Sequence, residues 1–251
     1  MNWLPPNGAL HGLAIDHLLR WHLSVLFWLF VASQVLLVAA LVRRWASRSE
    51  GRAAPPRSVA AFLFADLLPL AAITALYIWM MFASHRLWAA SREERENPQA
   101  VRVEVTGEQF QWYFRYPGAD GVFGATRPDL INAPAGNPLG VDPADAHSAD
   151  DIVSAILMLP AGRPVDVTLH SIDVIHGFSI PGMRLKQDAI PGMTGHLQFT
   201  PAVPGDYPIL CTQVCGLGHS RMQARLRVVA PADYERWISA RESALRAEGT
   251  R

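Results

Sequence analysis

The feature that most constrains this chain is a run of twelve residues near its C-terminal end, CTQVCGLGHSRM. The run contains both cysteines of the protein, together with a histidine and a methionine: Cys211, Cys215, His219 and Met222. Thiolate, imidazole and thioether groups form a soft ligand set, which favours copper over hard cations. Two thiolates can bridge two copper ions, and each ion then needs a nitrogen ligand. We therefore expect His176 to come from upstream and complete a binuclear copper centre.

Simpler interpretations of the same residues stay open at this point. Two cysteines in an exported domain most often form a disulfide. Two cysteines with two histidines can also form a closed tetrahedral zinc site, and a single methionine such as Met222 usually packs in a core. Copper is favoured because all the donor types occur together. Gly216 and Gly218 also leave the loop free to wrap around a metal.

This run and the upstream segment SIDVIHGFSIP, residues 171–181, resemble subunit II of the haem–copper cytochrome c oxidases. The soluble domain of that family carries the dinuclear copper site called Cu-A. Carried over position by position, the resemblance implies a ligand set of five side chains and one backbone carbonyl: His176, Cys211, Cys215, His219, Met222 and the carbonyl of Gln213. The family often has glutamate at position 213, whose side chain helps to bind magnesium at the interface with subunit I. Gln213 lacks this carboxylate, so the resemblance does not by itself imply the magnesium site, whereas the copper contact needs only the carbonyl.

Two apolar runs in the first third of the chain predict a membrane anchor. Residues 21–42 and 59–85 each supply the stretch of about 20 apolar residues that crosses a bilayer. The loop between them, residues 43–58, has five arginines against one glutamate, and the positive-inside rule places such a loop in the cytoplasm. Residues 1–20 and everything after residue 90 then lie outside, in the periplasm of a Gram-negative cell. We expect Asp66 to lie near the cytoplasmic end or to face a partner helix.

Residues 91–230 are predicted to form a β domain. Val101, Val103 and Val105 alternate with charged residues, which is the period of a half-buried strand. Further strands are predicted over residues 152–159, 164–169, 173–180, 195–200, 205–210 and 222–229, separated by turn signals typical of a sandwich. With the family resemblance, the expected fold class is a two-helix transmembrane hairpin followed by an all-β cupredoxin-like Greek-key sandwich. Residues 231–251 should form a polar C-terminal helix and tail anchored by Trp237, and residues 184–193 resemble a segment that packs against subunit I.

Two segments are candidates for receiving an electron donor. Residues 107–117 are rich in aromatic side chains, and the family often uses a tryptophan here as the place where electrons from cytochrome c enter. The matching position is Phe110, with Trp112 two residues later, and packing in the core is the alternative role for both. Residues 119–151 form an acidic insertion that could attract a basic cytochrome c, the alternative being an ordinary solvated loop. Its docking candidates are Asp142, Asp145, Asp150 and Asp151.

Composition and resemblance together indicate a function. The formal net charge is +0 and 50% of the residues are hydrophobic, so nothing suggests a nucleic-acid partner. The resemblance implies the subunit at which electrons enter a respiratory terminal oxidase of the bacterial inner membrane. It would take electrons from cytochrome c and pass them to the haem of subunit I, where oxygen is reduced and protons are translocated. We therefore expect no catalytic residue on this chain. The small copper subunit of a nitric oxide reductase, or a membrane-anchored copper-binding module without an electron-transfer partner, remains an alternative.

Overall fold

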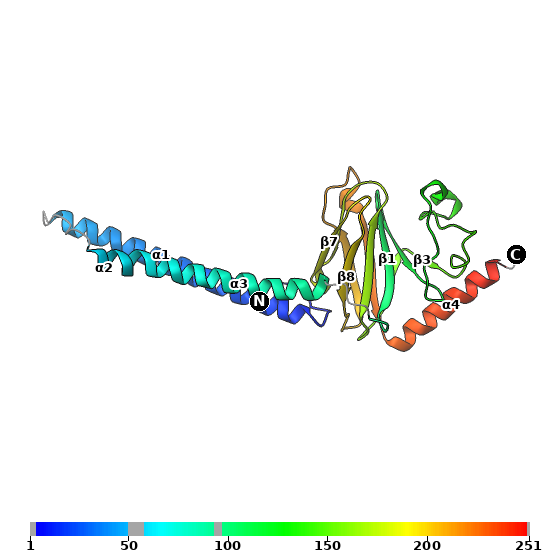
Figure 1. The fold of residues 1–251 in the computed structure, drawn as a ribbon, viewed down its shortest axis with the longest axis horizontal. Helices are drawn as coiled ribbons and strands as arrows, with labels where there is room; N and C mark the ends of the chain where they lie inside the picture. Colours follow the sequence, from blue (N-terminus) through cyan, green and yellow to red (C-terminus); the bar gives the residue numbers. More distant parts are fainter. Residues whose placement is uncertain (1–3, 50–57, 93–96, 250–251) are drawn as a thin grey trace. The chain divides into compact units, whose positions relative to one another are not determined.

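The computed structural model of the chain describes residues 4–49, 58–92 and 97–249. It contains two compact units, of which one comprises Met1–Leu13 with Ser91–Arg251 and the other Ala14–Ala90. The first unit is a β sandwich with a C-terminal helix, and the second consists of long apolar helices (Figure 1). The predicted order of a helical hairpin followed by a β sandwich is therefore confirmed.

The helical unit is built from α1 (Gly12–Ser49) and, after the residues outside the described part, α2 (Val59–Phe62) and α3 (Leu68–Arg92). Both long helices are apolar enough to cross a membrane by length and composition, over Gly12–Ser47 and Leu68–Ala89. The rings of Trp21 and Trp79 lie 4.6 Å apart, so α1 and α3 pack against each other. Helix α1 begins nine residues earlier than the predicted span, because the polar residues before Trp21 continue the same helix.

A π-helical turn, Leu63–Leu67, joins α2 to α3 and contains Asp66. Pro69, the second residue of α3, has no amide hydrogen to donate to the carbonyl four residues earlier, while its ring would clash with that carbonyl. A wider turn relieves the clash, which is one of the established causes of a helix irregularity. Part of the predicted loop at 43–58 is the end of α1, and its residues 50–57 lie outside the described residues.

Two five-stranded sheets form the sandwich. The first sheet has the order β3-β2-β1-β5-β8 and the second β4-β10-β9-β6-β7. Neighbouring strands are antiparallel except for the pairs β1–β5 and β4–β10, which are parallel. The bounds of the strands are β1 Val101–Glu108, β2 Gln111–Tyr116, β3 Ile152–Ser154, β4 Ile156–Pro160, β5 Val165–Ser171, β6 His176–Ile180, β7 Leu185–Ala189, β8 Gly195–Phe199, β9 Gly205–Cys211 and β10 Gln223–Val229.

Two strand predictions need correction. The single strand predicted over residues 152–159 is interrupted at Ala155, and its halves β3 and β4 belong to different sheets. The chain therefore crosses from one layer of the sandwich to the other within one residue. Strand β7 was not predicted, since its buried residues Leu185 and Ala189 are separated by three polar residues with no alternating pattern. It pairs with β6 along its whole length, so residues 184–193 belong largely to the sandwich itself.

The core lies between the two sheets and consists mainly of aliphatic and aromatic side chains. The C-terminal helix α4 (Pro231–Gly249) covers one part of it. Trp237 of this helix packs edge-on against Tyr116, with ring centroids 5.2 Å apart. The predicted role of Trp237 as the packing anchor of the helix is therefore confirmed.

A short arm before α1 is part of the β unit. The amide of Gly8 donates to the carbonyl of Gly182 at 2.8 Å, and the amide of Leu10 donates to the carbonyl of Thr200 at 3.0 Å. Ala9 forms a β-bridge with Pro201 and is buried. A fragment that begins after the helices would lack this arm, so experiments on the site call for the full chain.

Candidate metal centre

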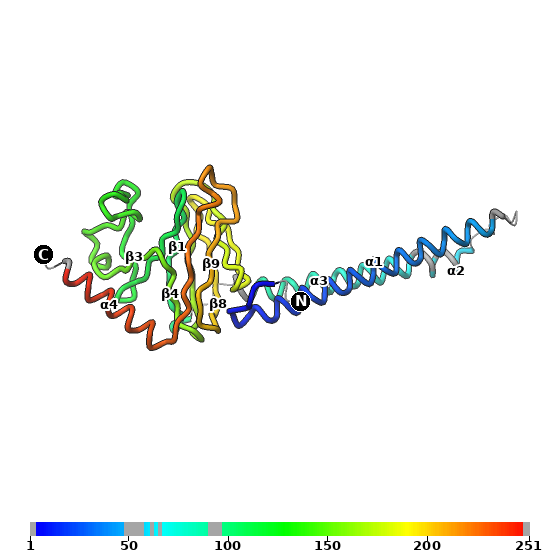
Figure 2. Tube along the Cα trace, turned by 180° about the vertical axis from the view of Figure 1, so that it is seen from behind, coloured from blue at the N-terminus to red at the C-terminus, as the bar shows by residue number. Residues whose placement is uncertain are grey.

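The sandwich positions the predicted donors through two adjoining strands. Strand β9 ends at Cys211, β10 begins just after Met222, and the antiparallel pairing of these strands closes the loop between them. The amide of Cys211 donates to the carbonyl of Met222 at 3.1 Å, so the hydrogen-bonded ladder extends to both ends of the loop. Strand β6 begins at His176 and pairs with β9. Figure 2 shows this loop, in orange, at one end of the sandwich.

The two cysteines and the upstream histidine converge in the interior. The ligand atoms of His176, Cys211 and Cys215 all lie within 4.8 Å of one another, and all three residues are buried. The two sulfur atoms are 3.9 Å apart and both thiols are free, so the structure contains no disulfide at this point. Burial and a hydrogen bond with Cys211 raise the pKa of Cys215 to about 11. A metal bound here would therefore displace thiol protons.

The remaining predicted donors surround the two sulfur atoms. The carbonyl oxygen of Gln213 lies 3.2 Å from the sulfur of Cys211. Nδ1 of His219 lies 3.7 Å from the sulfur of Cys215, and the sulfur of Met222 lies 3.8 Å from the sulfur of Cys215. The structure thus gathers all six predicted donor groups in one cluster, although they come from segments 35 residues and more apart in sequence.

His176 is oriented by a carboxylate behind it. Its Nε2 lies 2.8 Å from Oδ1 of Asp173, and its Nδ1 is buried without a hydrogen-bond partner. A buried polar nitrogen without a partner is costly unless something binds it. His176 clusters with two free thiols, and the thioether of Met222 lies against one of them, so the donor set fits a soft metal such as copper. Buried donors of this kind would hold the ion away from water.

The two aromatic candidates lie in different surroundings. Phe110, in the turn between β1 and β2, is 39% exposed and lies against the loop between β9 and β10, residues 212–222, where a Cβ atom at Gly218 would collide with its ring. Because this loop carries most of the donors predicted for copper, we call it the copper loop. Trp112 is buried, and its ring packs edge-on against that of His176 at 5.8 Å. Phe110 is therefore the candidate that a donor could reach from solvent, and Trp112 packs behind a ligand.

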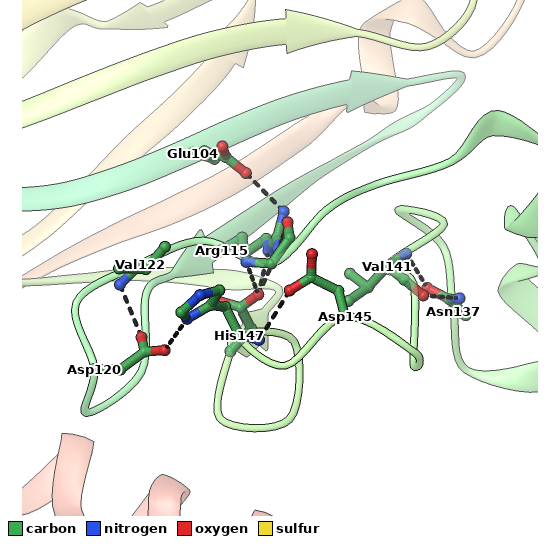
Figure 3. A network of polar contacts seen from close by, with 10 residues as sticks. Glu104, Arg115, Asp120, Val122, Asn137, Val141, Asp145 and His147 are labelled. Carbon is green, nitrogen blue, oxygen red and sulfur yellow. Dashed lines mark hydrogen bonds and ion pairs between the residues drawn. The ribbon is translucent and has the colours of Figure 1, made fainter.

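The acidic insertion is held together by its own carboxylates. Asp151 is buried and forms an ion pair with Arg115, which also donates to Glu104 at 3.0 Å (Figure 3). This burial corrects the inclusion of Asp151 among the docking candidates, since its carboxylate cannot meet a partner. The other three docking candidates are half-buried and accept hydrogen bonds from amides of the insertion: Asp142, Asp145 and Asp150. The insertion also meets helix α4, with which it lines a pocket.

Sequence reasoning missed the polar residues and the exposed apolar residues around the loop. Asp173 carried a usable signal, since it precedes His176 by three residues. Gln109 carried none, because the carbonyl to which its side chain donates belongs to Cys215, 106 residues away. Val214 and Leu217 are almost fully exposed at the tip of the loop, so the surface over the donors is apolar.

A known protein family and several known proteins match this chain in sequence. The family model described as cytochrome c oxidase subunit II, periplasmic domain, matches residues 101–229, which is about half of the chain. The chain belongs to this family. All the predicted metal donors fall within the matched residues.

Individual relatives carry the same name. The alternative cytochrome c oxidase subunit 2 of Bradyrhizobium diazoefficiens is 41% identical over 141 residues, which is 55% of this chain and 50% of that protein. Cytochrome c oxidase subunit 2 of Synechocystis is 33% identical over 150 residues, covering 60% of this chain and 35% of that protein. The chain thus spans about half the length of these curated relatives, or less. The crystal structure of the periplasmic domain of subunit II of cytochrome oxidase of Bradyrhizobium japonicum is 25% identical, with a TM-score of 0.43 over 59% of this chain and 98% of that one.

Family membership also bears on the role of the two long helices. Helices α1 and α3 are long and apolar enough to cross a membrane, and the matched domain is one that the family places in the periplasm. The chain is therefore a membrane-anchored subunit.

Proposed function

We propose that this chain is the subunit at which electrons enter a respiratory terminal oxidase. The observation that supports the proposal is the convergence of six donor groups at the end of the sandwich: His176, Cys211, the carbonyl of Gln213, Cys215, His219 and Met222. A copper pair held by these residues would carry one electron at a time. The donors come from the start of β6 and from a loop anchored by β9 and β10, which suits a relay whose geometry changes little, because the sheet preorganises the ligands.

The surroundings of the cluster fit a relay between two protein partners. Phe110, Val214 and Leu217 form an exposed apolar surface over the loop, against which a donor such as cytochrome c would dock. The half-buried carboxylates Asp142 and Asp145 would add long-range attraction for a basic donor, an effect that weakens with salt. On the other side, His219 would face the haem-bearing subunit I, to which the electron passes.

We further propose the cellular arrangement and the partners. Helices α1 and α3 would form a multi-pass anchor in the bacterial inner membrane, with the β unit on the periplasmic side. The partners would be subunit I and the other oxidase subunits, cytochrome c and the lipid bilayer. Oxygen would be reduced to water on subunit I, coupled to proton translocation. Gln213 would supply its carbonyl to copper, and a magnesium ion at the subunit interface would need other ligands.

The first test is a metal count with electron paramagnetic resonance on the full chain in detergent micelles, loaded with copper after reduction of the thiols. We expect two copper ions per chain and a spectrum of one unpaired electron shared between both nuclei. Met222→Leu should alter that spectrum, because it removes a donor 3.8 Å from Cys215. Met193→Leu is the matched control, since Met193 is exposed. One copper per chain, bound zinc, or a Cys211–Cys215 disulfide that refuses metal would contradict the proposal.

A second test concerns the partners. Membranes that contain the chain should yield a complex with a haem-bearing subunit, and reduced cytochrome c should reduce the copper in that complex at a rate that falls with salt. Reduction of nitric oxide instead of oxygen by the complex would favour the reductase alternative. Copper binding without any co-purifying subunit would favour the membrane-anchored copper-binding module.

A further inference from the structure

A hydrogen-bonded strap connects three segments beneath the copper loop. Oδ1 of Asp173 accepts from Nε2 of His176 at 2.8 Å, and Oδ2 accepts from the backbone amide of Gln109 at 2.8 Å. The side-chain amide of Gln109 in turn donates to the backbone carbonyl of Cys215. Two side chains therefore link the start of β6, the turn between β1 and β2, and the loop that carries the cysteines.

The carboxylate decides which nitrogen of His176 is free. An ionised carboxylate is only an acceptor, so in the neutral imidazole Nε2 carries the proton and Nδ1 carries the lone pair. Nδ1 is the buried atom of His176 that lacks a hydrogen-bond partner, and the ring of His176 belongs to the cluster with both cysteines. With Nε2 held by Asp173, Nδ1 is the nitrogen left to bind a metal. A neutral imidazole with the opposite tautomer would present a proton to the metal position. Asp173 therefore holds His176 in the state that can bind a metal.

Gln109 connects the same carboxylate to the cysteine loop. A Cβ atom on residue 216 would lie only 2.9 Å from the side-chain nitrogen of Gln109. Gly216 also has a φ of 140°, which residues with a side chain rarely adopt. A glycine is thus required where the strap meets the loop. Gln109 also precedes Phe110, whose ring lies against Gly218. The strap therefore fixes the position of the copper loop relative to His176. It also fixes the position of the Phe110 ring.

We propose that Asp173 and Gln109 are positioning residues of the metal centre, which act together to set the tautomer of His176 and the distance of Cys215 from it. This inference rests on the proposed function, because it presumes that the cluster holds copper. Groups that orient a metal-bound histidine in this way typically change metal affinity by about 10- to 100-fold when they are removed.

The test compares copper affinity and redox behaviour in the full chain in detergent micelles. Copper affinity is measured by competition with a copper(I) chelator, and the reduction potential and the paramagnetic resonance spectrum are recorded for the copper-loaded protein. Asp173→Ala removes both acceptors, whereas Asp173→Asn keeps one acceptor oxygen without the charge. Gln109→Ala removes only the bond to the loop. Asp188→Ala is the matched control, because Asp188 lies on the neighbouring strand β7 with similar side-chain exposure and pairs with Lys186 instead.

We expect Asp173→Ala to lower copper affinity by about 10- to 100-fold. Its reduction potential should rise, because a negative charge near His176 is removed, and Asp173→Asn should share the higher potential but lose less affinity. Combining Asp173→Ala with Gln109→Ala should cost less affinity than the product of the two single losses, since both break one strap. Asp188→Ala should change none of these quantities.

Two kinds of failure are distinguishable. Failure of the wild-type chain to bind two copper ions would overturn the proposed function. If the wild-type chain binds two copper ions but Asp173→Ala and Asp173→Asn keep its affinity, potential and spectrum, the proposal that Asp173 and Gln109 position the metal centre is refuted. A fall in the melting temperature of the metal-free Asp173→Ala chain alone, with unchanged copper properties, would show that Asp173 only supports the fold. Should Asp173→Ala fail to fold, the potential and affinity of Asp173→Asn decide.

Discussion

Replacing Arg115 of β2 by methionine should strongly destabilise the β unit and its contact with the acidic insertion. Arg115 and Asp151 have side chains that are each 1% exposed, and they form an ion pair in the interior. Arg115 also donates to Glu104 and to the carbonyl of Gly124, so one guanidinium fastens the insertion to β1 and β2. Methionine would fill much of the same volume but leave the carboxylate of Asp151 buried without a counter-charge.

The expected loss follows from that uncompensated charge. Removing one partner of a buried ion pair typically costs about 3–5 kcal/mol in the free energy of unfolding. For a unit of this size, about 1 kcal/mol corresponds to roughly 2–4 °C, so the melting temperature should fall by about 6–20 °C. Burial raises the pKa of Asp151 despite Arg115. Without Arg115 the deficit should therefore shrink as the pH is lowered and the carboxyl becomes protonated in the folded state.

Differential scanning calorimetry of the metal-free full chain in detergent micelles measures the effect. Arg127→Met is the matched control, because Arg127 lies in the insertion itself and pairs with Asp129 and Asp142, but its side chain is 54% exposed. An exposed pair of this kind contributes at most about 1 kcal/mol. Equal shifts for the two variants, or a shift below about 2 °C for Arg115→Met, would refute the argument that burial of the pair dominates.

Three further predictions follow from other parts of the β unit. Gly218→Ala should push the ring of Phe110 away from the copper loop and lower stability by about 1–3 kcal/mol, measured by thermal unfolding; an unchanged melting temperature would contradict that packing. The hydrogen bond that His147 donates to the carboxylate of Asp120 raises the pKa of His147, so nuclear magnetic resonance should show His147 titrating above its usual 6.5. The stabilisation that this bond provides should disappear as the pH rises through the higher pKa, because the imidazole then gives up its charge. Asp120→Asn should return the titration to the usual range. Gly8→Val should displace the N-terminal arm, because a side chain there would collide with a tyrosine of β9, and hydrogen exchange at the amides of the arm should then become faster.

Local patterns in the sequence were enough for the long helices, for most of the strands and for the donors of one loop. The apolar runs predicted both long helices, because a membrane-crossing helix needs only length and composition. Alternation predicted β1, and the spacing of Cys211, Cys215, His219 and Met222 predicted four of the metal donors, because these four belong to one loop. His176 was expected as the second nitrogen donor from upstream, a position that the family resemblance also implied, and the sandwich brings it beside the cysteines.

Tertiary structure decided everything that depends on contacts between distant segments. Asp151 looked like a docking carboxylate, yet Arg115 buries it, and a charge on a loop carries no local sign of its partner. The break at Ala155 separates β3 from β4 only because the two halves find partners in different sheets. Gln109 reaches Cys215 across 106 residues, so no local pattern could connect them. The sequence by itself therefore determined which chemistry the donors can support. Folding determined which nitrogen of His176 is free, which carboxylate holds the other nitrogen and which surface covers the donors, because hydrogen bonding and burial are properties of the assembled sandwich.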